Sequence, residues 1–403
     1  MRAALDHIRV LDLSRVLAGP WAGQILADLG AEVIKVERPD GGDDTRGWGP
    51  PYLKDKNGKD SDTAAYYLAA NRGKKSIAID MATAEGAALI KKLAQNCDIL
   101  IENFKTGGLA KYGLDYDSLS KDHPGLIYCS ITGFGQTGPL AHHAGYDFIV
   151  QGMAGLMSIT GSAESGPTKV GTAVADLTTG MYGVIGILAA LAHRGQTGQG
   201  QHIDMALFDT QLSWLANQNL NYLVGGQVPG LLGNAHPSIV PYQDFETLDG
   251  HLIVAVGNDR QFARFANLLG HEEWAQDNRF SRNAGRVRHR DQLIPQIIGI
   301  MKSRTTEEWR QCLNDIRVPN GPINTIAQAF DEETAKARGL KVTMDHPVSG
   351  QVDLVANPIK MSATPIKYKS APPAHGAQAD DILHDLGLSH SEIEALREKG
   401  VVG

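Results

Sequence analysis

The sequence predicts an α/β protein with a large domain built on a Rossmann-like parallel sheet and a smaller α+β domain. Residues 8–37 have the pattern of strand, helix and strand, because two β-rich segments flank a stretch with helical periodicity. Such a unit predicts a parallel sheet with helices on its faces. After an amphipathic helix at 82–95, buried strands are expected at 98–104 and from Leu126.

The first turn between strand and helix argues against a dinucleotide site. Glu37 ends the second strand, where a dinucleotide-binding fold places its ribose-binding acid, but the turn at 14–20 has one glycine in place of three. Residues 133–138 match G-x-G-x-x-G, yet Pro139 follows directly and no long helix is expected there. The sequence therefore predicts a glycine-rich active-site turn and no NAD site.

The chain changes character after residue 210, where the first part of the large domain, 1–210, is expected to end. Residues 211–240 are polar, rich in Gly and Pro, and long for an ordinary connection, which predicts a functional linker and glycine loop. Residues 241–328, with a hairpin turn at 249–250, are expected to form the small domain. Residues 329–403 are expected to return to the large domain.

That returning segment carries two predicted elements. Residues 357–365 predict a strand. A final helix is expected to begin with a capping box at Ser389–Glu392 and to end at Gly400.

Composition narrows the class of protein. The 403 residues are 42% hydrophobic and 21% charged, as in an ordinary soluble protein, and 38 basic against 45 acidic side chains argue against a nucleic-acid surface. Three cysteines fit no metal spacing and are too few for a disulfide framework. The N-terminus lacks the apolar core of a signal peptide, and the apolar run 180–192 is too short to span a bilayer. We expect a cytoplasmic protein with no metal, membrane or nucleic-acid partner.

One acid stands out within residues 171–195. Asp176 precedes an apolar run with no charge until Arg194. The first-turn amides and the dipole of a helix beginning there favour an ionised carboxylate. The residues alone leave two interpretations open: a helix N-cap, with Thr178 and Thr179 in the first turn, or a carboxylate nucleophile.

Two loops carry candidate anion-binding cations. The first, 41–51, contains Arg46 and Trp48 as its bulky groups, and a solvated arginine is the commoner explanation. The second, 71–75, has three cations in four positions around Gly73, which fits a phosphate site. A solvated basic turn explains that run equally simply.

Several motifs in order resemble CoA-transferase family III, the CaiB/BaiF group that includes formyl-CoA transferase. They are LDLSRVLAGP, ADLGAEVIKVERP, NRGKKSIAID, ENFKTGGLAKYGL, YCSITGFGQTGP, AGYD, ADLTTG and the closing helix with GVV, and they cover essentially the whole chain. The resemblance implies an interlocked homodimer, with coenzyme A and acyl-CoA as substrates and no permanently bound cofactor.

The resemblance also implies site residues. Asp176 would attack an acyl-CoA thioester, giving a mixed anhydride and then an aspartyl-CoA thioester. An ordinary Asp pKa near 3.9 would leave it ionised at neutral pH without an auxiliary base. Positions lining the CoA site fall on Val16, Arg38, Lys75, Asn103, Phe104 and Lys111, and Arg72 is added from the basic turn.

Two departures from formyl-CoA transferase matter. Leu17 stands where that enzyme has a glutamine, which removes an oxalate-specific contact. Lys111 replaces an arginine, which keeps the charge and loses the bidentate fork.

Substrate contacts are expected on three loops. Residues 233–236 align with the family's mobile glycine loop, so the amide of Gly233, or those of Gly135 and Gln136, are candidates for stabilising an oxyanion, and His236 is either a lid residue or a surface histidine. The segments 42–51, 233–245 and 321–324 look most like the subgroup that moves CoA between dicarboxylic acids, such as succinyl-CoA to glutarate. Arg46 would then grip the second carboxylate.

Two alternatives complete the expectations. An α-methylacyl-CoA racemase of the same fold needs a histidine before the acid of a G-H-D motif. This chain has Gly145-Tyr146-Asp147, so Tyr146 is instead a candidate substrate contact and transferase chemistry is favoured. In a catalytically silent CoA-binding protein, Asp176 would be only a cap.

Overall fold

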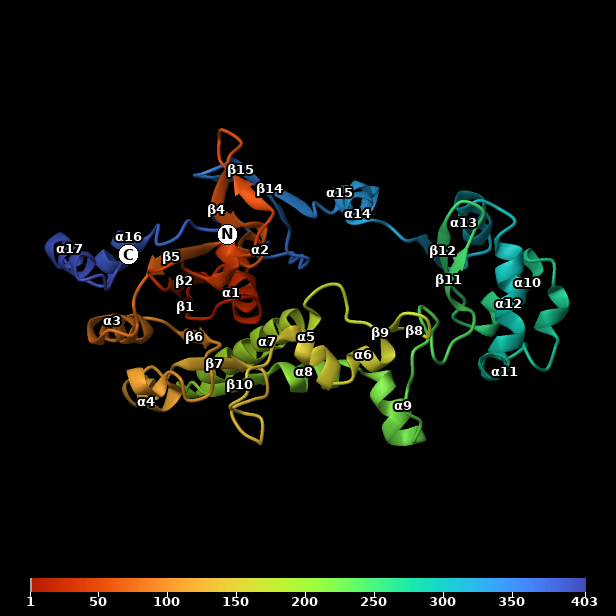
Figure 1. Cartoon of the computed structure of the whole chain (residues 1–403), viewed down its shortest axis with the longest axis horizontal. Helices are drawn as coiled ribbons and strands as arrows, with labels where there is room; N and C mark the ends of the chain where they lie inside the picture. The colour runs from red at the N-terminus through yellow and green to blue at the C-terminus, as the bar shows by residue number, and fades with distance from the viewer. Residues whose placement is uncertain (1) are drawn as a thin grey trace. The chain divides into compact units, whose positions relative to one another are not determined.

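A parallel sheet of six strands forms the centre of the larger part of the chain (Figure 1). All five neighbouring pairs are parallel, which confirms the predicted Rossmann-like sheet. Parallel neighbours need long crossover connections, and these are the helices of the unit. In spatial order the strands are β10 (His202–Ala206), β7 (Ile127–Thr132), β6 (Ile99–Glu102), β1 (Arg9–Asp12), β2 (Glu32–Glu37) and β5 (Lys74–Ala78).

Helices cover both faces of this sheet, so its strands are largely buried on both sides, except for the edge strand β10, whose residues are mostly exposed or half-buried. Each face has its own apolar core. On one face lie α1 (Ala18–Asp28), α5 (Asp147–Met153), α7 (Val174–Thr197) and α8 (Leu207–Trp214). On the other lie α3 (Ala84–Gln95), α4 (Tyr116–Asp122), α16 (Ala379–Asp385) and α17 (His390–Glu398), the last with the predicted capping box.

The computed structural model describes residues 2–403, which divide into two units. The smaller unit takes residues 227–333, where the sequence led us to expect 241–328. It also takes residues 157–169, which we expected in the large domain. The larger unit consists of the rest of the described chain.

The smaller unit is an α+β arrangement around a three-stranded antiparallel sheet. The hairpin expected around residues 249–250 joins its first two strands. Its strands are β11 (Tyr242–Glu246), β12 (His251–Ala255) and β13 (Asn320–Pro322), and its helices are α10 (Asp259–Leu268), η3 (Glu272–Ala275), α11 (Asn283–Arg288), α12 (Arg290–Met301) and α13 (Thr306–Asp315).

The strand predicted at 357–365 does not form. The side chain of Asn357 accepts the N–H of Ile359 at 2.9 Å, and Pro358 and Pro365 carry no N–H for a ladder. An antiparallel hairpin, β14 (Lys341–His346) and β15 (Gly350–Val355), precedes this segment instead. The remaining elements are η1 (Asp44–Gly47), β3 (Tyr52–Lys54), β4 (Asp60–Ala64), α2 (Ala65–Ala70), η2 (Ala110–Tyr112), α6 (Leu156–Ile159), β8 (Gly161–Ser162), β9 (Gly166–Pro167), α9 (Asn217–Gly225), α14 (Ile326–Asp331) and α15 (Glu333–Ala337).

Helix α7 packs closely on α1 because its facing residues are small. A β-carbon at Gly180 would lie 2.5 Å from the carbonyl oxygen of Ala18, so only glycine allows this approach. At Gly186 a β-carbon would lie 3.3 Å from Ile203 on β10. Gly180 follows Asp176 by one helical turn, so the start of α7 is fixed beside the start of α1.

The same helix is longer than the 13-residue apolar run suggested. Within residues 2–403, α7 alone is long and apolar enough to cross a membrane, and half of its most apolar window is buried in the protein. The argument that this segment is too short for a span is therefore wrong. A buried core helix has the same length and composition, and the cytoplasmic location stays a prediction.

Candidate active site

Asp176 lies in the first turn of α7 and does not cap it. The helix begins at Val174, with Ala173 at the N-cap position, and no side chain of its own segment caps it. The N-cap interpretation of Asp176 is therefore wrong. Across residues 2–403, no side chain or amide donates a hydrogen bond to the Asp176 carboxylate, so its lone pairs are not tied up within the subunit.

Its surroundings disfavour the charged form. Burial, and secondarily the negative charge of Asp147, raise the pKa of Asp176 to about 7. The expectation of full ionisation at neutral pH is thus wrong for the isolated subunit. A carboxylate with such a pKa is a stronger base and nucleophile, when ionised, than an exposed aspartate.

An aromatic pair lies near this acid. Burial and the charges of Asp176, Asp147 and Asp43 raise the pKa of the Tyr66 phenol, which therefore stays a neutral hydrogen-bond donor. Trp48 meets the Tyr66 ring edge to face, with centroids 5.2 Å apart. The sequence singled out Trp48 as a bulky loop residue, but nothing in the sequence pattern distinguished Tyr66.

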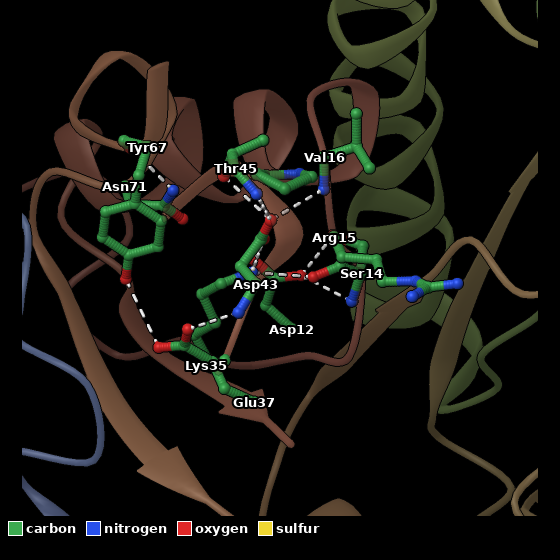
Figure 2. Close-up of polar contacts among 12 residues, drawn as sticks. Asp12, Ser14, Arg15, Val16, Lys35, Glu37, Asp43, Thr45, Tyr67 and Asn71 are labelled. Carbon is green, nitrogen blue, oxygen red and sulfur yellow. Dashed lines mark hydrogen bonds and ion pairs between the residues drawn. The ribbon is translucent and has the colours of Figure 1, made fainter. Parts of the chain in front are cut away.

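The turn before α1 is strained and firmly held. Val16 has φ of +72°, a conformation that a β-branched residue adopts only when its surroundings impose it. Asp43 accepts the Val16 N–H at 3.2 Å (Figure 2). Asn103 binds the Arg15 backbone from both sides, accepting its N–H at 3.0 Å and donating to its carbonyl at 2.6 Å. The structure thus brings together Val16 and Asn103, two of the predicted CoA-site residues.

Asp43 is anchored by a buried ion pair below this turn. The Lys35 ammonium lies 2.8 Å from Asp43 Oδ2, and neither side chain is exposed (Figure 2). Burial alone would raise the pKa of Asp43, but Lys35 and the Thr45 N–H hold it at about 2. A buried pair is costly to desolvate, and here it fixes an acceptor for a strained backbone.

The other predicted CoA-site residues lie at the surface or hold neighbouring backbone. The Arg38 guanidinium is half exposed and contacts Asp44 at 2.9 Å, and the Lys75 ammonium contacts Glu32 at 2.6 Å. Lys111 is exposed, with its ammonium 4.6 Å from the Tyr112 ring centroid. The Phe104 N–H donates to the buried Glu102 carboxylate at 2.7 Å. Ion pairs at the surface are weak, so the Arg38 and Lys75 side chains can exchange these partners for a phosphate.

Arg72 does not belong to this set. It is buried, and its guanidinium binds both carboxylate oxygens of Asp28, at 3.0 and 2.7 Å, and the carbonyl of Val355. Lys74 is also buried, 2.8 Å from Asp12. The proposed anion site at 71–75 is therefore wrong for two of its three cations, because they tie the sheet, α1 and β15 together.

Arg46 is likewise a structural residue. Its guanidinium makes a bidentate pair with Glu37, both distances 2.8 Å, and lies 3.7 Å from the centroid of the Tyr67 ring. The side chain is almost fully buried. The expectation that Arg46 grips an acceptor carboxylate is contradicted by this geometry.

The oxyanion candidates are also engaged. The Gly135 N–H donates to Thr132, and the Gln136 N–H to Asp204, both at 2.9 Å. Their amides are therefore not free for an oxyanion. Tyr146, 63% exposed, precedes α5 and stays a candidate substrate contact.

Two expected lid residues lie in the smaller unit. The Gly233 N–H donates to Gly161 at 2.8 Å, and Nδ1 of His236 accepts the Ser238 N–H at 3.0 Å. Their role as a lid stays a prediction.

Comparisons with known proteins identify the family of this chain. The family model described as CoA-transferase family III matches residues 5–379. The chain is 52% identical to a succinate–glutarate CoA-transferase of Agrobacterium fabrum, over 95% of each protein. It is 40% identical to the human succinyl-CoA:glutarate CoA-transferase, covering 99% of this chain and 90% of the relative. A crystal structure of a CaiB/BaiF family protein from Brucella suis, 48% identical, superimposes with a TM-score of 0.84 over 96% of this chain and 100% of that one.

The chain therefore belongs to CoA-transferase family III and is a CoA-transferase. The family implies acyl-CoA as a substrate. Among residues 2–403, no group of three His, Cys, Asp or Glu side chains is placed to hold a metal ion.

Asp176→Asn should stabilise the protein above pH 7. The pKa of Asp176 is about 7 in the folded protein, above the ordinary value of 3.8, so the wild type loses stability as the pH rises from about 4 through 7. The asparagine variant has no such group and keeps its stability over this range. We expect the variant to be more stable by about 1–3 kcal/mol at pH 8 and close to wild type at pH 4, measured by urea unfolding. The exposed Asp40→Asn is the control. Equal differences at both pH values would contradict the assigned pKa.

Proposed function

We propose that this chain transfers CoA from succinyl-CoA to a dicarboxylic acid such as glutarate, with Asp176 as the nucleophile. The observation that supports Asp176 as the nucleophile is a desolvated carboxylate at a helix N-terminus that receives no hydrogen bond from the described part of the chain. The relatives named for succinate and glutarate support the substrates.

The reaction needs no net proton transfer. An Asp176 oxygen attacks the thioester carbonyl carbon and the C–S bond breaks. CoA departs as a thiolate, and a mixed anhydride forms between Asp176 and the donor acid. The thiolate attacks the aspartyl carbonyl of that anhydride, which releases the donor acid as a carboxylate and gives an aspartyl-CoA thioester. The acceptor carboxylate then attacks the aspartyl-CoA thioester, which releases CoA thiolate and gives a second mixed anhydride. The thiolate attacks the acceptor carbonyl of that anhydride, so that the acceptor leaves as its CoA thioester and the Asp176 carboxylate is regenerated.

The position of Asp176 suits this cycle. The N-terminal turn of α7 places partial positive charge near the oxyanion that develops at each step. The partial burial of Asp176 limits the access of water, which would otherwise hydrolyse the anhydrides. In a catalytically silent CoA-binding protein, a carboxylate that destabilises the fold when ionised would have no function at this position. The racemase alternative lacks its second base, because Tyr146 replaces the histidine.

Activity assays with a panel of acids test the proposal. Wild-type protein with succinyl-CoA should form glutaryl-CoA from glutarate faster than it forms the CoA thioesters of monocarboxylates or oxalate, followed by chromatography of the thioesters. Asp176→Asn should lower kcat by at least about a thousandfold, because no other carboxylate takes the nucleophile's place. Asp40→Asn serves as the control. Near wild-type exchange by Asp176→Asn would end the assignment.

We also propose that two copies form the homodimer that the family resemblance implies. A soluble monomer rarely exposes a large continuous apolar patch, and several helices of the larger unit expose large apolar side chains. We call these the apolar helix faces: Phe148, Ile149 and Met153 of α5, Met181, Tyr182, Ile185 and Leu188 of α7, Leu212 and Trp214 of α8, and Leu220, Tyr222, Leu223 and Val224 of α9.

Light scattering after size-exclusion chromatography tests the dimer. Wild type should have the mass of two chains, and Ile185→Arg, at a side chain 60% exposed on α7, should shift it to one chain or to aggregates. Ile359→Arg, at an exposed residue outside the apolar helix faces, should leave the mass unchanged. A wild-type mass of one chain would contradict the proposal.

A further inference from the structure

The first turn of α7 receives its missing cap from another helix. Ala173 provides no side-chain acceptor. Asp147, in the first turn of α5, accepts the N–H of Ala175 at 2.8 Å through Oδ1. Ala175 directly precedes Asp176, so this bond fixes the backbone that carries the nucleophile.

The second oxygen of Asp147 is held as well. Gln151, one turn later on α5 and fully buried, donates from Nε2 to Asp147 Oδ2 at 2.7 Å. Its Oε1 accepts the N–H of Val170 at 2.9 Å. Because both of its oxygens accept hydrogen bonds, the Asp147 carboxylate is fixed in orientation. Asp147 and Gln151 together hold Ala175 at the start of α7 and Val170 in the segment before it.

Asp147 also places a second negative charge beside Asp176. Burial is the larger cause of the raised pKa of Asp176, and Asp147 adds to it. The two carboxylates lie close enough to affect each other. The third titratable group near them is the phenol of Tyr66 on α2, whose pKa is raised, so that it stays neutral. Asp147 thus supplies both an acceptor for the helix start and a like charge for the nucleophile.

We propose that Asp147 is a positioning residue for CoA transfer, which presents the Asp176 carboxylate without a hydrogen bond of its own and strengthens it as a nucleophile. This rests on the proposed role of Asp176. The geometry assigns Gln151 to the same device, as the residue that orients Asp147.

The test separates charge from position. Asp147→Asn removes the charge, and we expect the acid limb of the pH profile of kcat/KM for succinyl-CoA to move down by about half a unit or more, because a like charge is lost. The amide nitrogen of the new asparagine would face the amide nitrogen of Gln151, and two donors cannot form a hydrogen bond. The side chain would lose its fixed orientation, so kcat on the plateau should fall about tenfold or more. Asp147→Asn with Gln151→Glu restores a donor–acceptor pair and should recover most of the plateau.

Gln151→Ala provides an independent variant should Asp147→Asn fold poorly. It keeps the Asp147 charge and frees its orientation, so we expect a lower plateau with the acid limb unmoved. KM for succinyl-CoA should change little in all three variants, and Asp40→Asn is the matched control. An unmoved acid limb in folded Asp147→Asn, or an unchanged plateau in Gln151→Ala, overturns this inference. Wild-type protein without CoA transfer overturns the proposed function instead.

Discussion

The main constraint on this structure is that it holds one carboxylate, that of Asp176, in a position where little water solvates it. Asp176 lies at the start of a largely apolar helix. Among residues 2–403 no group donates a hydrogen bond to its carboxylate, and its pKa is raised to about 7. Two contacts keep the helix there: Gly180 lets it approach α1, and Asp147 accepts the N–H of the preceding residue. An aspartate that destabilises the fold when ionised fits the nucleophile we propose, since displaced pKa values are typical of active-site groups.

Most of the strong charge pairs near the site serve the fold. Four buried ion pairs join strands of the sheet and adjacent segments to each other, to α1 and to η1: Lys35–Asp43, Lys74–Asp12, Arg46–Glu37 and Arg72–Asp28. Breaking one partner of such a pair is strongly destabilising, typically by about 3–5 kcal/mol. Their function here is to fix backbone, as Asp43 does for the strained turn at Val16.

The sequence predicted the periodic parts of the fold well. Residues 8–37, the helix at 82–95 and the capping box at Ser389 all formed as expected, because hydrophobic period and cap chemistry act over short distances. The strand at 357–365 failed because a local side-chain bond and two prolines compete with the ladder. Family motifs led us to Asp176, Val16 and Asn103, whose places beside the starts of α1 and α7 the structure describes, while their roles in catalysis and CoA binding stay predictions.

Roles that depend on burial could not be predicted. The sequence around Arg46 and Arg72 is compatible with ligand-binding arginines. Only the folded structure shows that each guanidinium is already paired, Arg46 with Glu37 and Arg72 with Asp28. The raised pKa of Asp176 has the same origin, since burial and the nearness of Asp147 are absent from local sequence. The contributions of Tyr66 and Gln151 likewise appear only when α2, α5 and α7 come together.

Covalent capture of the nucleophile tests the central claim most directly. Protein incubated with succinyl-CoA and then treated with hydroxylamine or borohydride should show, by peptide mass spectrometry, modification at Asp176 and at no other acid. An unmodified Asp176 in protein that is actively exchanging CoA would contradict the account.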